Sequence, residues 1–263
     1  RQRQMCIRDS VYSAKGGVGK TVTVVNLAAA LAELGNKVLC IDIDPQGNLS
    51  DYLGYDFDNN SHTVADVMKG TCHLSNCIVF NEAENIYYVP ADITLATADL
   101  FLAQTMCREQ VLRHAIVTDE EIDKFDYILI DCLPSLGILL TNALAVADGV
   151  IIPVQMQKFA LNGIVQFEDI FNLVKENINP KLRIFGILET MTERTAMSKE
   201  IDKVLNNRYN DLVFGTKISR RIEAANSTAE RISLVSKKSS TIGDQYRQLA
   251  QEILNKEAAP NGV

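Results

Sequence analysis

The stretch Lys15-Gly16-Gly17-Val18-Gly19-Lys20-Thr21 decides the fold of this chain. Glycine tolerates positive φ and a close approach of the backbone, so N–H groups of such a loop can converge on phosphate oxygens. Lys20 can then reach the β- and γ-phosphates, and the Thr21 hydroxyl can bind Mg²⁺. Ala14 stands where the general pattern G-x-x-x-x-G-K-[ST] has its first glycine. The sequence predicts a phosphate-binding loop with an additional lysine, Lys15, at its front.

The residues around this loop support the prediction. A phosphate-binding loop of this kind follows a strand and opens a helix. We expect residues 11–14 to end a short strand and residues 20–34, whose apolar positions recur at helical spacing, to form a helix that Gly35 ends. The alternative, a glycine-rich surface turn before a helix, does not explain why strand, loop and helix follow in this order.

The N-terminal segment does not fit a buried strand. Such a strand is usually an apolar run, but Arg8, Asp9 and Ser10 interrupt it. We therefore expect residues 1–10 to be an atypical segment that is disordered or foreign to the domain. Residues 11–257 are predicted to form one domain, followed by a flexible tail over residues 258–263.

Composition favours one large α/β domain. The chain has 263 residues, 47% of them hydrophobic and 22% charged, and no repeat or linker divides it. Charged and polar residues interrupt its most apolar region, residues 127–154, so we expect no membrane span there. The N-terminus shows no signal-peptide pattern.

The six cysteines are scattered along the chain without zinc-type spacing. Cys72-His73 and Cys77 suggest a metal site, but a fourth ligand is not apparent. Reduced thiols in a cytosolic protein are the favoured interpretation.

Charge is unevenly distributed. Residues 181–250 hold thirteen Lys and Arg against eight Asp and Glu, a net charge of +5, whereas the whole chain carries −7. The asymmetry suggests an anionic partner for the C-terminal part, although an ordinary solvated surface explains the charge equally well.

Apolar runs and amphipathic stretches alternate along the chain. This order predicts a three-layer α/β/α fold of the P-loop NTPase type, with a twisted, mostly parallel sheet and ligands at the carboxyl ends of its strands. The predicted strands are residues 38–43, 86–89, 127–130, 149–154 and 182–188; the further predicted helices are residues 97–116, 159–174, 198–207 and 240–254.

Two aspartates follow the second predicted strand. Pro45 and Gly47 mark a sharp turn there, which places Asp44 at the sheet edge where the phosphate loop opens. A carboxylate at this position can orient a water for in-line attack on a γ-phosphate. The alternative is a turn or helix-cap residue, a common role for aspartate. Asp42 is a further candidate, either for a structural role or for the Mg²⁺ shell.

Asp131 ends the apolar strand at residues 127–130. A carboxylate in this position can hold Mg²⁺ through water. Many strands end in aspartate, so the signal is weak by itself and gains weight only together with the segment Cys132-Leu133-Pro134-Ser135-Leu136-Gly137 that follows.

These motifs together resemble the ParA/MinD family of ATPases, and most closely its ParA/Soj partition branch. The loop K-G-G-V-G-K-T is similar to the deviant Walker A motif, D-I-D-P-Q-G-N to Walker A′, and D-C-L-P-S-L-G to the segment that contains Walker B. The resemblance implies ATP and Mg²⁺ as cofactors. It implies catalytic roles for Lys15, Lys20 and Asp44, and magnesium ligation by Thr21 and, through water, Asp131. The implied nucleotide-binding residues are Lys15, Gly16, Gly17, Val18, Gly19, Lys20, Thr21 and Val22.

The resemblance also implies a nucleotide-switched homodimer in which Lys15 of one protomer reaches the phosphates of the other. Such dimers bind DNA without sequence preference, and a ParB/Spo0J-like centromere-binding protein stimulates their hydrolysis of ATP. The implied activity is chromosome or plasmid partition. The implied location is the nucleoid in the cytoplasm, and no membrane is expected among the partners.

Arginines in the basic C-terminal part match positions that the family uses for DNA. Arg194 and Arg220 are the implied contacts, and Arg221 is a further candidate. Glu223 stands where a second DNA-contacting arginine is expected, so Arg221, Lys217 or Lys199 would have to supply that charge.

Other functions remain as alternatives. A MinD-like positioning ATPase would need a basic amphipathic C-terminal helix to dock on membranes, and residues 251–260 are short and not basic. A P-loop kinase or synthetase, or a regulator that binds ATP and turns over slowly, is also compatible with the loop.

Overall fold

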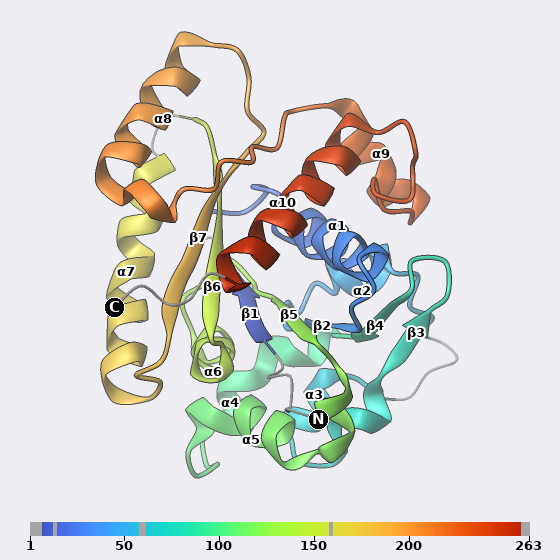
Figure 1. Ribbon diagram of the computed structural model, residues 1–263. Coiled ribbons are helices and arrows are strands. Elements are labelled where there is room, and N and C mark those ends of the chain that lie inside the picture. Colours follow the sequence, from blue (N-terminus) through green and yellow to red (C-terminus); the bar gives the residue numbers. More distant parts are fainter. Residues whose placement is uncertain (1–6, 13–14, 58–61, 158–159, 259–263) are drawn as a thin grey trace.

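A computed structural model of the chain describes residues 7–12, 15–57, 62–157 and 160–258. These residues contain a seven-stranded sheet in the order β3-β4-β2-β5-β1-β6-β7 (Figure 1), in which only the edge pair β3–β4 is antiparallel. The strands are β1 (Ile7–Val11), β2 (Val38–Asp42), β3 (Val79–Asn81), β4 (Ile86–Val89), β5 (Tyr127–Asp131), β6 (Gly149–Gln155) and β7 (Arg183–Thr190).

Helices join the strands and cover the sheet. The α-helices are α1 (Lys20–Glu33), α2 (Asn48–Tyr52), α3 (Val64–Met68), α4 (Ala98–Phe101), α5 (Val111–Thr118), α6 (Ile138–Val146), α7 (Ala160–Asn177), α8 (Ala196–Tyr209), α9 (Ile222–Glu230) and α10 (Thr241–Ala258). Short 3₁₀ turns are η1 (Leu74–Cys77), η2 (Ile93–Thr97), η3 (Arg108–Gln110), η4 (Glu120–Lys124) and η5 (Asn210–Leu212). No helix in this part of the chain is both long enough and apolar enough to cross a membrane.

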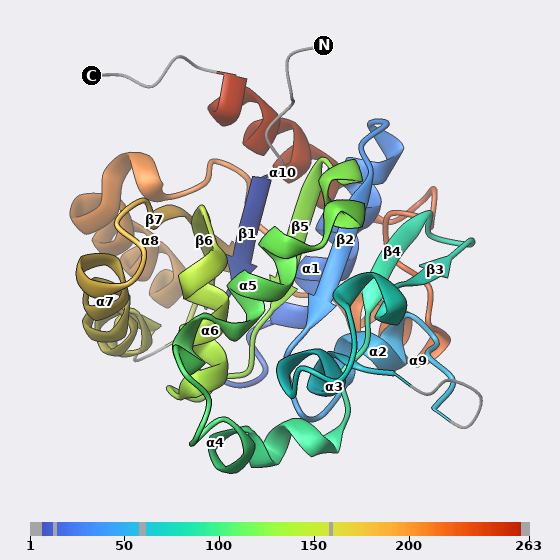
Figure 2. The same ribbon diagram turned by 90° about the horizontal axis from the view of Figure 1, so that it is seen from below.

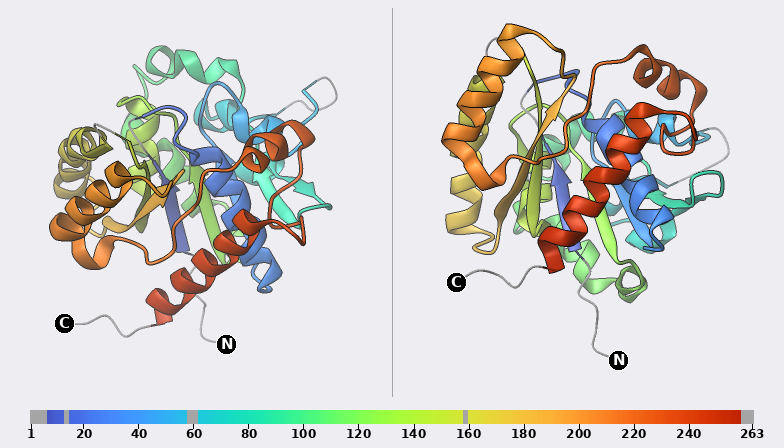
Figure 3. Two further views of the ribbon diagram at one scale, coloured as in Figure 1. Left: turned by 90° about the horizontal axis from the view of Figure 1, so that it is seen from above. Right: turned by 45° about the horizontal axis from the view of Figure 1, so that its top comes forward.

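Two hydrophobic cores lie on opposite faces of the sheet. Successive side chains of a strand point to opposite faces, so Leu129 packs with α1, α2 and α10 while Ile128 and Ile130 pack with α3, α5, α6 and α7. Figure 2 shows α3, α5 and α6 on one face, and both views of Figure 3 show α10 beside α1 on the other. The expected three-layer α/β/α fold is confirmed.

Strand β1 corrects the predicted boundary at residue 11. It pairs with β5 and β6 in the middle of the sheet, with Asp9 opposite Leu129 and Gly149. The expectation of an atypical or disordered segment is therefore wrong for residues 7–10, because their backbone groups complete two ladders and β1 leads into the phosphate loop. Residues 1–6, 13–14 and 259–263, to which the predicted segment, strand end and tail extend, lie outside the described residues.

The helix predicted over residues 97–116 is also wrong. The chain there forms α4, η3 and α5, with Cys107 at φ 51° just before η3. Such positive φ is incompatible with a continuous right-handed helix. The short edge strand β3 was not predicted either, because three residues carry too little periodicity.

Asp9 is a buried carboxyl in the central strand. It points to the same face as Val11, which belongs to the core under α1 and α10. Burial, followed by the charges of Glu257 and Asp148, raises the pKa of Asp9 to about 7, although Arg183 lowers it. The carboxyl therefore destabilises the fold once it is ionised.

We expect Asp9→Val to raise the free energy of unfolding, most strongly above pH 7. The folded-state pKa lies above the ordinary value of 3.8, so the wild type loses stability as pH rises from about 4 to 7, by up to about 1.4 kcal/mol per pH unit. Urea unfolding at pH 5 and pH 8 measures both effects. Asp9→Asn is the matched control: it should remove the part of the pH dependence that Asp9 contributes, so its loss of stability between pH 5 and pH 8 should be smaller than that of the wild type. Equal stability of wild type and Asp9→Val at pH 8 would contradict the prediction.

Candidate functional site

The phosphate loop connects the end of β1 to the start of α1. Gly17 and Gly19 have φ values of 73° and 90°, and Gly19 is the N-cap of α1. Residues with a side chain rarely adopt this left-handed backbone conformation, which explains why both positions are glycine. The loop leads into the first N–H groups and the positive dipole end of α1, an arrangement that binds anions.

Two hydrogen bonds hold the loop in shape. Lys20 Nζ donates to the carbonyl oxygen of Lys15 at 3.1 Å, and Thr190 Oγ1 at the end of β7 donates to the carbonyl oxygen of Val18 at 2.9 Å. Burial lowers the pKa of Lys20, opposed chiefly by the nearby Asp131 carboxylate. An ammonium group in this position is only partly hydrated, and phosphate oxygens can replace the lost water as partners of its charge.

Asp131 and Thr21 form the magnesium-binding candidate. Thr21 Oγ1 donates to Asp131 Oδ2 at 2.7 Å, whereas the buried Oδ1 of Asp131 has no hydrogen-bond partner among the described residues. Burial, followed by the charge of Asp42, raises the pKa of Asp131 well above its ordinary value. A hydroxyl beside an unsatisfied carboxylate oxygen is a donor set that Mg²⁺ prefers, with water completing the octahedron. These residues therefore fit Mg²⁺, which would neutralise phosphate charge when bound.

Asp42 and Asp44 lie at the carboxyl end of β2 but have different surroundings. Asp42 Oδ2 accepts hydrogen bonds from the Ser50 hydroxyl and N–H at 2.7 and 3.0 Å, and its Oδ1 accepts one from Asp44 N–H at 3.1 Å. Burial raises the pKa of Asp42 to about 6 despite these bonds. Both oxygens of Asp42 brace the turn, which favours the structural role over the magnesium shell. Asp44 lines the pocket, and one of its oxygens accepts from Gln46 N–H at 3.0 Å.

The side chain of Lys15 extends to the end of β6. Its Nζ donates to Gln155 Oε1 at 3.2 Å and to Gln157 Oε1 at 3.1 Å, and the residue is exposed. Lys15 thus lies at the rim of the loop and has a different position from the buried Lys20.

A pocket of about 900 Å³ opens in front of the loop. Residues 16–22, Asp44, Pro134, Met191 and residues 218–222 are among those that line it. Sequence reasoning assigned none of residues 218–222 or Met191 to the nucleotide pocket; Arg220 and Arg221 were expected to bind DNA. Met191 has a positive φ of 51°. The pocket brings together every predicted nucleotide-binding residue except Lys15, which remains at the rim.

The three predicted DNA-binding arginines lie beside this pocket. Arg220 lines it and pairs with Glu193 at 3.1 Å, whereas Arg194 lines a neighbouring hollow of about 510 Å³. Arg221 lines both. The two arginines therefore have different surroundings: Arg220 forms an ion pair with a carboxylate at the pocket, whereas Arg194 lies in the loop before α8.

An ion-pair cluster in the lining of that hollow connects β7 to α8; Glu189 is buried, whereas Lys217 and Asp202 are partly exposed. Lys217 Nζ lies 3.0 Å from Glu189 Oε2 and 2.6 Å from Asp202 Oδ1 on α8. Burial raises the pKa of Glu189 to about 7. Since Glu189 precedes Thr190, which holds the phosphate loop, one lysine connects the nucleotide pocket to the helix that follows Arg194.

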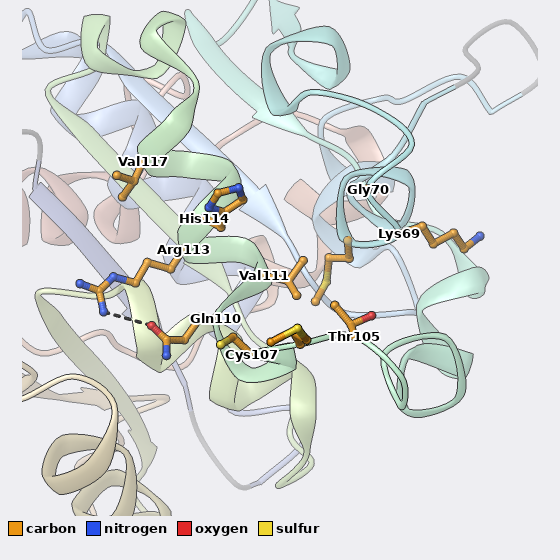
Figure 4. Close-up of a pocket in the computed structure, with 11 residues that line it drawn as sticks. Lys69, Gly70, Thr105, Cys107, Gln110, Val111, Arg113, His114 and Val117 are labelled. Carbon is orange, nitrogen blue, oxygen red and sulfur yellow. Dashed lines mark hydrogen bonds between the residues drawn. The ribbon is translucent and has the colours of Figure 1, made fainter.

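Another pocket, of about 610 Å³, lies away from the phosphate loop between α3 and α5 (Figure 4). His114 and Arg113 come from α5, and Arg113 donates to Gln110 at 3.4 Å. Its lining mixes apolar side chains such as Val111 with these polar ones and lacks the loop that positions phosphate.

Comparisons with known proteins agree with this geometry. Residues 8–184 match the family described as AAA domain. The chain is 38% identical over 247 residues to the sporulation initiation inhibitor protein Soj of Bacillus subtilis, covering 93% of this chain and 96% of Soj. It is 36% identical over 252 residues to the chromosome partitioning protein ParA of Caulobacter vibrioides, covering 94% of each chain.

A solved structure shows the same architecture. The cobyrinic acid a,c-diamide synthase of Mycobacterium smegmatis, with bound ATP analog and magnesium, superposes with a TM-score of 0.85 and 33% sequence identity, covering 97% of this chain and 96% of that one. Together with the phosphate loop and the two strand-end aspartates, these similarities show that the chain belongs to the ParA/Soj family of P-loop ATPases.

Proposed function

We propose that this protein is a Mg²⁺-dependent ATPase that forms an ATP-bound homodimer, binds DNA without sequence preference and drives partition of a chromosome or plasmid. The observation that carries the ATPase is the pairing of Thr21 with Asp131, whose second carboxylate oxygen is buried and unsatisfied, at the foot of the phosphate loop. The DNA-related part is supported by relatives named for chromosome partitioning.

Hydrolysis requires a water placed in line with the γ-phosphate. Asp44 lines the pocket together with the phosphate loop, and its turn is braced by Asp42 and Ser50. Since Asp44 has an oxygen engaged with the Gln46 N–H, its carboxylate orientation is set before the substrate binds. We assign Asp44 to water positioning and Lys20 to the charge on the phosphates.

Dimerisation would follow from the position of Lys15. Its Nζ contacts two glutamine oxygens at the exposed rim, so it can exchange them for phosphate oxygens of a facing protomer, which bind an ammonium group more strongly. A γ-phosphate shared in this way makes dimer stability depend on the nucleotide state. Hydrolysis would then release the protomers.

DNA binding is assigned to the basic surface around the loop before α8. Arg194, Lys199 and Arg221 line one hollow there, and all three are exposed. Non-specific binding depends on phosphate neutralisation and counterion release, which a basic surface can provide without fixed base contacts. A ParB/Spo0J-like protein is the proposed partner that stimulates hydrolysis.

The membrane-associated alternative has less support. The C-terminal helix α10 has one basic residue, Lys256, in its last turn and buries Tyr246, Leu249 and Ile253 in the core with α1. An apolar face already covered by the domain is not available for a lipid surface. Synthase chemistry, suggested by the name of one structural neighbour, would require acceptor-substrate contacts, and fold similarity alone does not transfer function.

Lys20→Ala tests nucleotide binding. Loss of a charge-assisted contact to phosphate should weaken ATP binding by about 10- to 100-fold. Titration with a fluorescent ATP analogue measures the dissociation constant. Lys175→Ala, which removes a lysine on α7, is the control and should retain wild-type affinity. Unchanged affinity for ATP in Lys20→Ala would contradict the assignment of this loop as the phosphate-binding site.

Lys15→Ala and Asp44→Ala separate dimerisation from hydrolysis. Lys15→Ala should bind ATP as a monomer, because the contact across the dimer is lost. Asp44→Ala should form a persistent ATP dimer with turnover reduced by about 10²- to 10⁴-fold, because water positioning is lost. Light scattering with ATP and with ADP, together with phosphate release, distinguishes the two. A Lys15→Ala dimer, or normal turnover in Asp44→Ala, contradicts the respective assignment.

Arg194→Glu tests the DNA surface. A dimer that loses two phosphate contacts should bind duplex DNA more weakly, and its plot of log affinity against log salt should be shallower by about 2. ATPase activity without DNA should be unchanged. Arg113→Glu on α5 makes the same charge change elsewhere and serves as the control. An equal loss of DNA binding in both variants would place the effect in net charge and overturn the assignment of Arg194.

A further inference from the structure

Cys72 and Cys77 bring two thiols into contact outside the nucleotide site. Their Sγ atoms are 3.3 Å apart, on the loop that leads from α3 through η1 to β3. The three other described cysteines, Cys40, Cys107 and Cys132, have no such cysteine neighbour among the described contacts.

A metal ion is not the best explanation for this pair. No group of three or more His, Cys, Asp or Glu side chains within the described residues is arranged to hold one. His73 follows Cys72 in sequence, but it is the carbonyl oxygen of His73 that accepts from both thiols, at 3.3 Å from Cys72 Sγ and 3.7 Å from Cys77 Sγ. Two sulfurs alone do not complete a tetrahedral zinc site.

The two thiols differ in access. Cys77 is 2% exposed and also contacts the carbonyl oxygen of Thr63 at 3.6 Å, whereas Cys72 is only partly buried. Burial and the neighbouring thiol raise the pKa of Cys77. A small reagent can therefore reach Cys72 first, and Cys77 can attack only a sulfur that is already beside it.

We propose that Cys72 is a site of thiol–disulfide exchange with low-molecular-weight disulfides and that Cys77 is its resolving thiol. The Cys72 thiolate attacks one sulfur of the reagent disulfide, forms a mixed disulfide and releases one thiol. Cys77 then loses its proton to solvent and attacks Cys72 Sγ, which releases the second thiol and leaves a Cys72–Cys77 disulfide. The two protein thiols are oxidised, and one reagent disulfide is reduced to two thiols.

The loop backbone is held in a conformation that permits this bond. Ser75 N–H donates to Asp119 Oδ2 at 2.8 Å and Asn76 N–H donates to the His73 carbonyl at 3.1 Å, so the turn between the cysteines is closed already. Formation of the bond requires the sulfurs to approach by about 1.3 Å, to a separation of about 2.05 Å. Rotation about the side-chain bond of the partly exposed Cys72 can supply such a movement.

Oxidation of the pair would constrain a neighbouring surface. The same loop starts at Lys69 and Gly70, which form one wall of the pocket in Figure 4. Thr63, whose carbonyl Cys77 contacts, caps α3 and donates through Oγ1 to Asp92 Oδ2 at 2.7 Å. A disulfide would therefore tie the end of α3 to the start of β3 without reaching the phosphate loop.

The experiment is thiol mapping of the full-length protein. The protein is incubated in glutathione buffers from fully reduced to fully oxidised, blocked with an alkylating reagent, digested and analysed by mass spectrometry. The wild type should yield a Cys72–Cys77 linked peptide that is two hydrogen atoms lighter than the reduced pair, before Cys40 and Cys132 react. Cys107→Ser, which removes an exposed cysteine, is the matched control and should form the same link.

Single variants test the order of attack. Cys77→Ser should stop at a glutathione adduct on Cys72, because the resolving thiol is absent. Cys72→Ser should leave Cys77 reduced under conditions that oxidise the wild-type pair, because buried Cys77 cannot react alone. The proposal would be overturned if Cys72 and Cys77 were each recovered with the alkylating group in a buffer in which Cys107 carries glutathione. ATP binding should be unchanged in both variants, which separates this outcome from failure of the nucleotide site.

Discussion

The hydrogen bond from Thr21 to Asp131 is the contact on which the candidate site depends. It joins the first turn of α1 to the carboxyl end of β5, and it is possible only because β1 lies beside β5 and delivers the phosphate loop at the same sheet edge. A carboxylate in this position is buried at a cost, visible in its raised pKa and its unsatisfied oxygen. Such a cost is common where a protein binds a cation and a polyanion together.

The end of β7 connects this site to the basic surface. Thr190 holds the phosphate loop through Val18, and the adjacent Glu189 pairs with Lys217, which also reaches α8 through Asp202. Residues 218–222, directly after Lys217, form a pocket wall. A change in pocket occupancy and a change in the position of α8 therefore act on the same short segment. In the proposed function, coupling between nucleotide binding and DNA binding would require no longer path than this.

Much of the fold follows from local sequence. The phosphate loop, the five predicted strands and the helices at residues 20–34, 198–207 and 240–254 correspond to observed elements because each has a clear period or a glycine signal. Prediction failed at β1, where polar Asp9 and Ser10 occupy a central strand, and at residues 97–116, where apolar spacing concealed a break at Cys107. In both places tertiary contacts outweighed local preference.

The sequence by itself determined the chemistry of the site. Glycines at positions that need positive φ, a lysine and a threonine at the helix start, and aspartates at strand ends can be recognised without coordinates because their roles depend on short spacings. Only the tertiary structure decided which partners those groups have. Asp42 braces a turn, Lys15 lies at the rim with two glutamines, and Arg220 lines the nucleotide pocket. The reason is physical, since burial and long-range partners arise from strand order and helix packing, which no local spacing specifies.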